Sequence, residues 1–226
     1  MVVVSNCAYV ACAYGGLKVY SVTNPANPVL LGMIDVGRAE HADSLWVEGT
    51  RVYLAVNERG LMILDASNPA AIAVLGEYRA GGPFFGPVCV LSNRAYLALN
   101  TDLAVLDVSD PAAPALLGQR RVSSTNGAYH IHGLCARGNH VYCANYTEGL
   151  KTVDVSNPAS MHITATNVFD AVGVCDYAAR GLVRRGDTLF MTQDGYGLMS
   201  FDLGAPATPV LITNFIPSAV PFPYDA

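Results

Sequence analysis

Short apolar runs and tight turns alternate along the whole chain. In residues 38–80, four apolar runs at 45–48, 51–56, 61–66 and 73–78 are separated by Gly-Thr, Asn-Glu-Arg-Gly and Ser-Asn-Pro turns. Apolar and polar residues alternate within the runs, which is typical of β-strands, because successive strand side chains point to opposite faces. Asn and Pro favour turns, since Asn hydrogen-bonds its own backbone and Pro presets φ. The pattern therefore predicts four consecutive short strands.

The same four-strand pattern returns five times. Its marker is a Gly-Leu pair, or Asp-Leu in the third repeat, followed by an apolar strand and a turn that contains Pro. The repeated leucines are Leu17, Leu61, Leu103, Leu150 and Leu198, so the intervals are 44, 42, 47 and 48 residues. A period of this length, filled with short strands, predicts the blades of a β-propeller. The predicted fold class is all-β, a propeller of five four-stranded blades.

Equivalent positions of the repeats carry similar residues. The second predicted strand has an aromatic residue at the same place in each repeat: Tyr9, Tyr53, Tyr96, Tyr142 and Phe190. The third strand ends in a short polar residue: Ser21, Asp65, Asp107, Asp154 and Asp202. Such a side chain can accept hydrogen bonds from the amides of the following turn. Because it recurs in every repeat, we interpret it as structural and not as catalytic.

The repeats resemble a known family. The segments GLKVYSVTNPANPVLLG, LAVLDVSDPAAPALLG and GLKTVDVSNPA are similar to the LVIVD-type propeller repeat, and the resemblance covers about residues 1–215. The fifth repeat departs from the pattern, because its turn, at 202–206, has lost the Ser-Asn pair. The resemblance implies a toroid of four-stranded blades, often on secreted or surface proteins. It implies no single activity, since one fold serves many functions.

We predict a single domain over residues 1–226. Its blades are expected at about 1–37, 38–80, 81–124, 125–171 and 172–216, followed by a Pro-rich tail at 217–226. Five blades lie within the range of known propellers. A closed five-blade ring is the favoured interpretation, and a segment of a larger ring is the alternative.

The composition limits which partners the protein is expected to bind and in which cellular compartment it is expected. Charged residues make up only 14% of the chain and hydrophobic residues 52%, which fits interfaces between stacked blades. The net charge is -5 and no basic run occurs, so nucleic-acid binding is not expected. No apolar stretch approaches the roughly 20 residues of a membrane helix. The protein is expected to be either cytoplasmic or secreted with its leader absent from this sequence.

The cysteines carry no recognisable chemistry. None of the six forms a CxxC pair or a metal-finger spacing. Most are interpreted as small buried residues, because free cysteine packs as a hydrophobe. Nothing in their spacing requires a disulfide.

Residues that differ between repeats are the candidates for function. The starts of the innermost strands carry Asp43, His132 and Arg180 at equivalent positions, with His41 and His130 two residues earlier. Residues two apart on a strand point to the same side, so each pair can present two polar groups together. The longest connections feed these strands, and variable loops on a rigid frame commonly carry function.

These residues allow three interpretations. In the first, Asp43, His132 and Arg180 surround a small ligand, and Arg180 binds a carboxylate or phosphate as a bidentate donor. Aromatic residues would then pack on the apolar part of that ligand: Tyr129, Tyr177 and Phe84. In the second, His41, His130 and His132 bind a divalent transition metal. In the third, the polar residues only line a water-filled channel.

The predicted function is a non-catalytic propeller that binds a small molecule or a partner protein at the loop-rich face of its central funnel. The alternative is a metal-dependent hydrolase, lyase or oxidase that uses the histidines named above. The sequence contains no nucleophile elbow, phosphate-binding glycine loop or dinucleotide fingerprint, so no catalytic residue is assigned. No cofactor is expected other than the divalent metal of the alternative.

Overall fold

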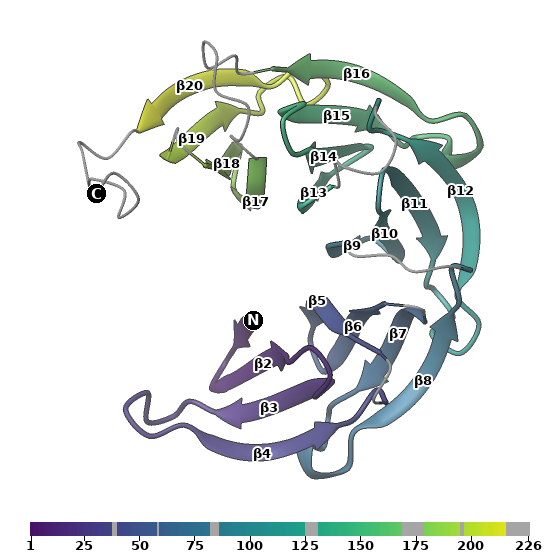
Figure 1. The fold of residues 1–226 in the computed structure, drawn as a ribbon, viewed down its shortest axis with the longest axis vertical. Coiled ribbons are helices and arrows are strands. Elements are labelled where there is room, and N and C mark those ends of the chain that lie inside the picture. Colours follow the sequence, from purple (N-terminus) through teal and green to yellow (C-terminus); the bar gives the residue numbers. More distant parts are fainter. Residues whose placement is uncertain are drawn as a thin grey trace, which may run out of the picture.

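The chain folds into five four-stranded antiparallel sheets, each built from one repeat (Figure 1). The structure is a computed structural model, which describes residues 1–37, 40–57, 59–81, 86–124, 131–168, 179–194 and 197–215. Strands follow one another in chain order within every sheet, so each sheet is an up-and-down meander. These sheets are the blades of a propeller, and the predicted fold class is confirmed.

The strands of each blade are short, and they follow one another from the centre of the molecule to its rim, with the fourth strand outermost (Figure 1). Blade 1 contains β1 (Val2–Val4), β2 (Cys7–Ala11), β3 (Leu17–Ser21) and β4 (Val29–Ile34). Blade 2 contains β5 (Ala42–Glu48), β6 (Arg51–Val56), β7 (Gly60–Asp65) and β8 (Ala73–Tyr78). Blade 3 contains β9 (Val88–Leu91), β10 (Arg94–Leu99), β11 (Asp102–Asp107) and β12 (Ala115–Arg121).

The last two blades follow the same plan. Blade 4 contains β13 (Gly133–Arg137), β14 (His140–Ala144), β15 (Leu150–Asp154) and β16 (His162–Asn167). Blade 5 contains β17 (Ala179–Arg185), β18 (Thr188–Gln193), β19 (Gly197–Asp202) and β20 (Val210–Phe215). Two single-turn 3-10 helices, η1 (Pro69–Ala71) and η2 (Pro158–Ser160), form at the Asn-Pro turns of blades 2 and 4.

The recurring polar residue at the end of each third strand caps the next turn, as predicted. Asp65 Oδ1 accepts a hydrogen bond from the amide of Ser67 at 2.8 Å, and Asp107 and Asp154 accept equivalent bonds from Ser109 and Ser156. Hydrogen bonds from the same serines lower the pKa of all three carboxyl groups: for Asp107 and Asp154 the serine hydroxyl contributes most and the amide second, and for Asp65 the order is reversed. The residues therefore shape turns, and their structural interpretation is confirmed.

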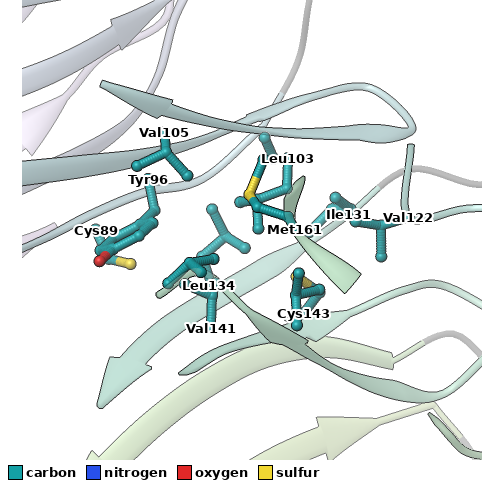
Figure 2. Packing of buried hydrophobic residues seen from close by; sticks show 13 residues of the cluster. Cys89, Tyr96, Leu103, Val105, Val122, Ile131, Leu134, Val141, Cys143 and Met161 are labelled. Atoms are coloured by element: carbon teal, nitrogen blue, oxygen red, sulfur yellow. The ribbon is translucent and has the colours of Figure 1, made fainter. Parts of the chain in front are cut away.

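The hydrophobic core lies between the blades. Figure 2 shows the interface of blades 3 and 4, where Tyr96 and Leu103 of blade 3 pack against Leu134 and Val141 of blade 4. The same arrangement recurs at the other interfaces, and the repeated leucine of the third strand is fully buried in the first four blades. Burial of these side chains supplies the main driving force for stacking the blades.

The described cysteines are mostly part of this packing. Cys89 and Cys143 are buried in the cluster of Figure 2, and their burial raises the pKa of both thiols, that of Cys143 to about 12. Cys7, Cys12 and Cys135 are half-buried, and none of these five is in a disulfide. The prediction of small core thiols is confirmed for the two buried residues.

The blades follow an open arc (Figure 1). Their innermost strands β1, β5, β9, β13 and β17 face the centre, and each packs on the next in turn. Blade 1 and blade 5 stand apart at the two ends of the arc, unlike the closed five-blade ring that we favoured from the sequence. The angle between neighbouring blades is set by how their side chains pack, and five blades stacked at these angles do not complete a turn.

Candidate functional site

One edge of the arc carries the described residues that differ between repeats at the starts of the inner strands. In an up-and-down blade, the start of the first strand lies beside the loop that joins the second strand to the third. Backbone hydrogen bonds tie this loop to the next blade: Ala13 bonds with Ala42, Asn100 with Ile131 and Tyr146 with Ala179. We call this the entrance edge, formed by the starts of β5, β13 and β17 and by the loops at 12–16, 100–101 and 145–149.

The first polar cluster lies on this edge at the boundary of blades 1 and 2. His41 Nδ1 pairs with the carboxylate of Asp43, and the ring of Tyr14 from blade 1 meets the His41 ring edge-on at 5.2 Å between centroids. The pairing register of β5 and β6 shifts between Ala42 and Ser44, so Asp43 lies in a β-bulge. A bulge re-aims the side chain that it carries and is often found beside functional sites.

The second cluster lies at the boundary of blades 4 and 5. Arg180 donates a hydrogen bond from Nε to one carboxylate oxygen of Asp194 at 2.8 Å, and its Nη2 forms an ion pair with the same oxygen, also at 2.8 Å. His132 of blade 4 packs on Tyr146, with 5.7 Å between ring centroids, and the backbone of Tyr146 pairs with Ala179 next to Arg180. The register of β17 also shifts between Ala179 and Leu182, so Arg180 lies in a bulge. The cluster thus combines the ion pair of Arg180 and Asp194 with the rings of His132 and Tyr146.

The electrostatics of the two clusters differ. Burial raises the pKa of Asp43, while its hydrogen bond to His41 opposes that shift. The hydrogen bond that Arg180 donates to Asp194 raises the pKa of Arg180, which keeps this guanidinium charged. Both Arg180 and Asp194 have side chains that are about half exposed, so solvent and solutes reach the pair.

The structure divides the predicted site residues between these clusters. Asp43 and His41 lie between blades 1 and 2, whereas His132 and Arg180 lie between blades 4 and 5. Four further predicted residues fall outside the described part of the chain: Phe84, Tyr129, His130 and Tyr177. The apolar wall and the His130–His132 pair therefore stay predictions. Among the described residues, no group of three His, Cys, Asp or Glu side chains is placed to hold a metal ion.

Sequence reasoning missed Tyr14, Tyr146 and Asp194. All three follow the second strand of their blade, and that place was interpreted only as a turn. The antiparallel order of the strands contains the missing signal, because it brings this turn to the same edge as the start of the inner strand. Tyr14 and Asp194 occupy a turn of variable sequence, so no repeat pattern marked them.

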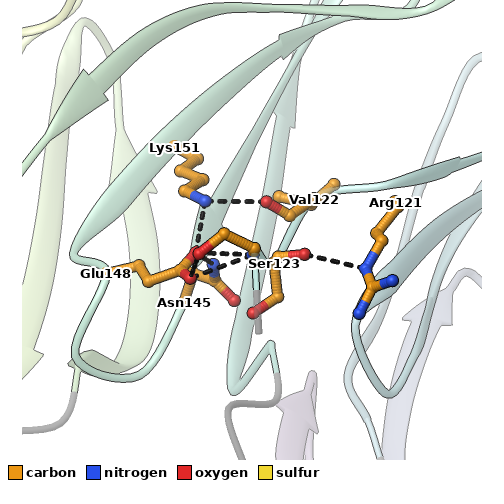
Figure 3. Close-up of polar contacts among 7 residues, drawn as sticks. Arg121, Val122, Ser123, Asn145, Glu148 and Lys151 are labelled. Carbon is orange, nitrogen blue, oxygen red and sulfur yellow. Dashed lines mark hydrogen bonds and ion pairs between the residues drawn. The ribbon is translucent and has the colours of Figure 1, made fainter. Parts of the chain in front are cut away.

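A third polar group crosses the interface of blades 3 and 4 (Figure 3). The buried ammonium of Lys151 donates to the carbonyl oxygen of Val122 at 2.7 Å and pairs with Glu148. Glu148 also accepts hydrogen bonds from Ser124 and from the side-chain amide of Asn145. Burial acts to raise the pKa of Glu148, but the hydrogen bonds from Lys151 and Ser124 outweigh it and lower the pKa. These contacts join two blades, and we interpret them as structural.

The fold and its variable edge define a repeat protein of the β-propeller class. The sequence pattern of the LVIVD repeat matches residues 1–36, 39–80, 87–121 and 132–166, which is more than half of the chain. The chain therefore belongs to the LVIVD-repeat family, as the quoted segments indicated. Blade 5 lies beyond these matches but forms the same four-stranded sheet. No curated protein matches the chain.

Solved structures show the same fold at low sequence identity. The computationally designed Ika8 protein is similar at 12% identity with a TM-score of 0.63, over 90% of this chain and 57% of that one. BamB from Moraxella catarrhalis is similar at 14% identity with a TM-score of 0.59, over 93% and 58%. A candidate 6-phosphogluconolactonase from Bacteroides uniformis is similar at 14% identity with a TM-score of 0.71, over 95% and 69%.

The chain thus spans less than two thirds of the first two of these structures. Identities of this size support a shared fold and no shared activity. Within the residues that the structure describes, no helix has the length and apolar character needed to cross a membrane.

Proposed function

We propose that this protein is a non-catalytic binding module, and that its entrance edge holds a small molecule or a partner protein through a carboxylate or phosphate group. The observation that carries the proposal is the placement of Asp43 and Arg180. Both lie in β-bulges at the start of an inner strand, on a frame that is otherwise repetitive. The two bulges lie at equivalent places and carry side chains of opposite charge. Ligand recognition explains this difference more readily than a role in building the blade does.

The second cluster is the better candidate for an anionic group. Arg180 is half exposed and directs Nε and Nη2 at Asp194, so its other terminal nitrogen, Nη1, can serve an added acceptor. A ligand carboxylate or phosphate can also replace Asp194 and take both donors in the bidentate geometry that guanidinium favours. The rings of His132 and Tyr146 lie beside this position and offer apolar surface to the rest of the ligand.

Thermal unfolding with a panel of small anions tests the proposal. The panel contains inorganic phosphate and simple mono-, di- and tricarboxylates, and the unfolding midpoint is compared between the wild type and His132→Ala/Arg180→Ala. A ligand that binds only the folded state increases the free energy of unfolding, by about 2.7 kcal/mol at a ligand concentration of one hundred times its dissociation constant. The unfolding midpoint therefore rises. We expect at least one anion to raise the midpoint of the wild type and to lose this effect in the double variant.

Arg185→Ala is the matched control, because Arg185 is an exposed arginine at the other end of the same strand. It should keep the full response. A panel without any response, or an equal response in the wild type and the double variant, would contradict the proposal.

A further inference from the structure

The two ends of the arc expose blade faces that are buried everywhere else. Each interface joins the far face of one blade, which carries the second-strand aromatic and the repeated leucine, to the near face of the next blade. The repeated leucine is 0% exposed in the first four blades: Leu17, Leu61, Leu103 and Leu150. Leu198, the same residue of blade 5, is 41% exposed. Within the described residues, the far face of blade 5 therefore has the side chains of a blade interface but no neighbouring blade packed on it.

Other apolar residues extend this uncovered face. The strand register places Phe215 beside Leu198, and Phe190 beside Val183. Phe215 is 63% exposed, Val183 is also exposed, and Phe190 is only half-buried. Exposed apolar residues that gather on one face usually mark an interaction surface.

The near face of blade 1 is the complementary half of such an interface. Val10 and Lys18 pair across β2 and β3 at the positions where blade 2 has the fully buried Leu54 and Met62. Val3 and Met33 lie on the same face as this pair and are exposed. Blade 1 thus offers the surface on which a preceding blade would place its aromatic residue and leucine.

Lys18 gives an independent indication of what is missing. Lys151 holds the same place in blade 4, in the same Gly-Leu-Lys sequence, and its side chain crosses the interface to bond the carbonyl oxygen of Val122 at the end of blade 3. A lysine at this place is therefore suited to a carbonyl group at the end of the preceding blade. In blade 1 the carbonyl group would belong to a blade before β1.

The Asn-Pro turn of blade 1 points the same way. At three interfaces a glycine of the outer strand lies so close to the Pro carbonyl of the next blade that an added Cβ would overlap it: Gly32 with Pro69, Gly76 with Pro111 and Gly118 with Pro158. Blade 1 has the corresponding Asn24-Pro25 turn, with Asn24 accepting a hydrogen bond from Ala26 as in the other blades. The turn of blade 1 therefore has the conformation on which the outer strand of a preceding blade would pack.

We propose that the two end faces of the arc bind further four-stranded blades of the same repeat type, which close a ring larger than five. The continuity of both faces with the four interfaces of the structure supports this occupant. The chain also covers 57–69% of the three solved structures named above, which share its fold. About two or three added blades would bring the ring to roughly seven or eight, within the range of known propellers. A second copy of the chain would bring ten blades together, too many for such a ring.

Substitutions in the 226-residue chain test whether the far face is open. Leu198→Ala should lower the unfolding midpoint by less than about 2 °C, because its side chain has few neighbours to lose. Leu103→Ala, the matched change inside an interface, should lower it by about 10 °C. Light scattering should give the mass of a monomer. An equal effect of the two substitutions would overturn the proposal and indicate that the tail, residues 217–226, covers the far face. A dimer that Leu198→Glu dissociates would overturn it too, and would indicate that a second copy of the chain covers this face.

An extended chain tests the occupant itself. Residues 81–168, which span blades 3 and 4, are appended as a second copy after residue 226. We expect a monomer with a higher unfolding midpoint and less binding of the dye ANS than the 226-residue chain, and Leu198→Glu in the extended chain should reverse both changes. ANS binding and a midpoint equal to those of the 226-residue chain would overturn the proposal. If the extended chain does not fold, the substitutions above decide.

Discussion

Equivalent side chains in the five repeats divide into those that build the blade and those that vary. The aspartate at the end of the third strand is a structural residue, since Asp65, Asp107 and Asp154 each accept a hydrogen bond from an amide of the following turn. Asp43 and Arg180 belong to the second kind and lie in bulges on the entrance edge. The distinction assigns construction to the repeated residues and recognition to the variable ones.

The turn aspartates make the stability of the protein sensitive to acid. Their folded-state pKa values lie below the ordinary value of 3.8, so the unfolded chain takes up protons first as the pH falls. Their contribution is complete above about pH 4 and is lost as the pH falls through the lowered values. Asp65→Asn/Asp107→Asn/Asp154→Asn keeps an acceptor oxygen and removes the titration, so its urea midpoint should fall less than that of the wild type between pH 5 and pH 3. An equal fall in both proteins would contradict this account.

The sequence could predict the role of these aspartates, because a short polar residue recurs before every turn and the chemistry of the turn is local. It could also place Asp43, His132 and Arg180 at the starts of inner strands. It could not show that they form two clusters, since the partners Tyr14, Tyr146 and Asp194 come from other loops. Contacts of that kind depend on how strands pair and blades stack.

The outer strand of a blade packs closely against a turn of the next blade, and this contact recurs between blades. The glycine in β12, Gly118, lies against the carbonyl group of Pro158 at the start of η2. Blade 4 replaces this glycine by Ala165 and adds a hydrogen bond from Thr164 to the carbonyl oxygen of Ala207, at 2.8 Å. Outer strands therefore dock on the next blade through close backbone contact or through a hydroxyl group.

Gly118→Ala should weaken the interface of blades 3 and 4. The new Cβ would overlap the Pro158 carbonyl, and relief of this overlap requires β12 and η2 to separate. We expect a loss of about 1–3 kcal/mol in the free energy of unfolding, measured by urea denaturation. Gly204→Ala is the control, because a Cβ there would meet only ordinary contacts, and it should change stability by less than about 0.5 kcal/mol. Equal effects of the two substitutions would argue against a tight fit.

The strands were largely predictable, because alternation and turn residues mark them directly. The exceptions are informative. The inner strand of blade 2 was predicted at 45–48 but begins at Ala42, since the bulge at Asp43 interrupts the alternation. The fifth repeat lacks the Ser-Asn turn but keeps its sheet, because the pairing of β17 to β20 depends on the apolar pattern more than on that turn.

The assembled molecule differs from the sequence-based interpretation in one respect. The repeats predicted five blades correctly, but the closed ring that we favoured is an open arc (Figure 1). The number of repeats in a sequence does not fix the angle between blades, which results from the volumes packed at each interface. Leu198 matches the buried leucines in sequence, and only the structure shows it exposed.

The two end faces, and the inference drawn from them, depend on one claim, that the five repeats form a continuous open arc. Small-angle X-ray scattering of the 226-residue chain, eluted from a size-exclusion column with light scattering for its mass, tests this claim most directly. The account predicts a monomer whose scattering profile fits the arc of Figure 1, with blades 1 and 5 apart. A monomer whose profile requires a closed, more compact five-blade ring would contradict it.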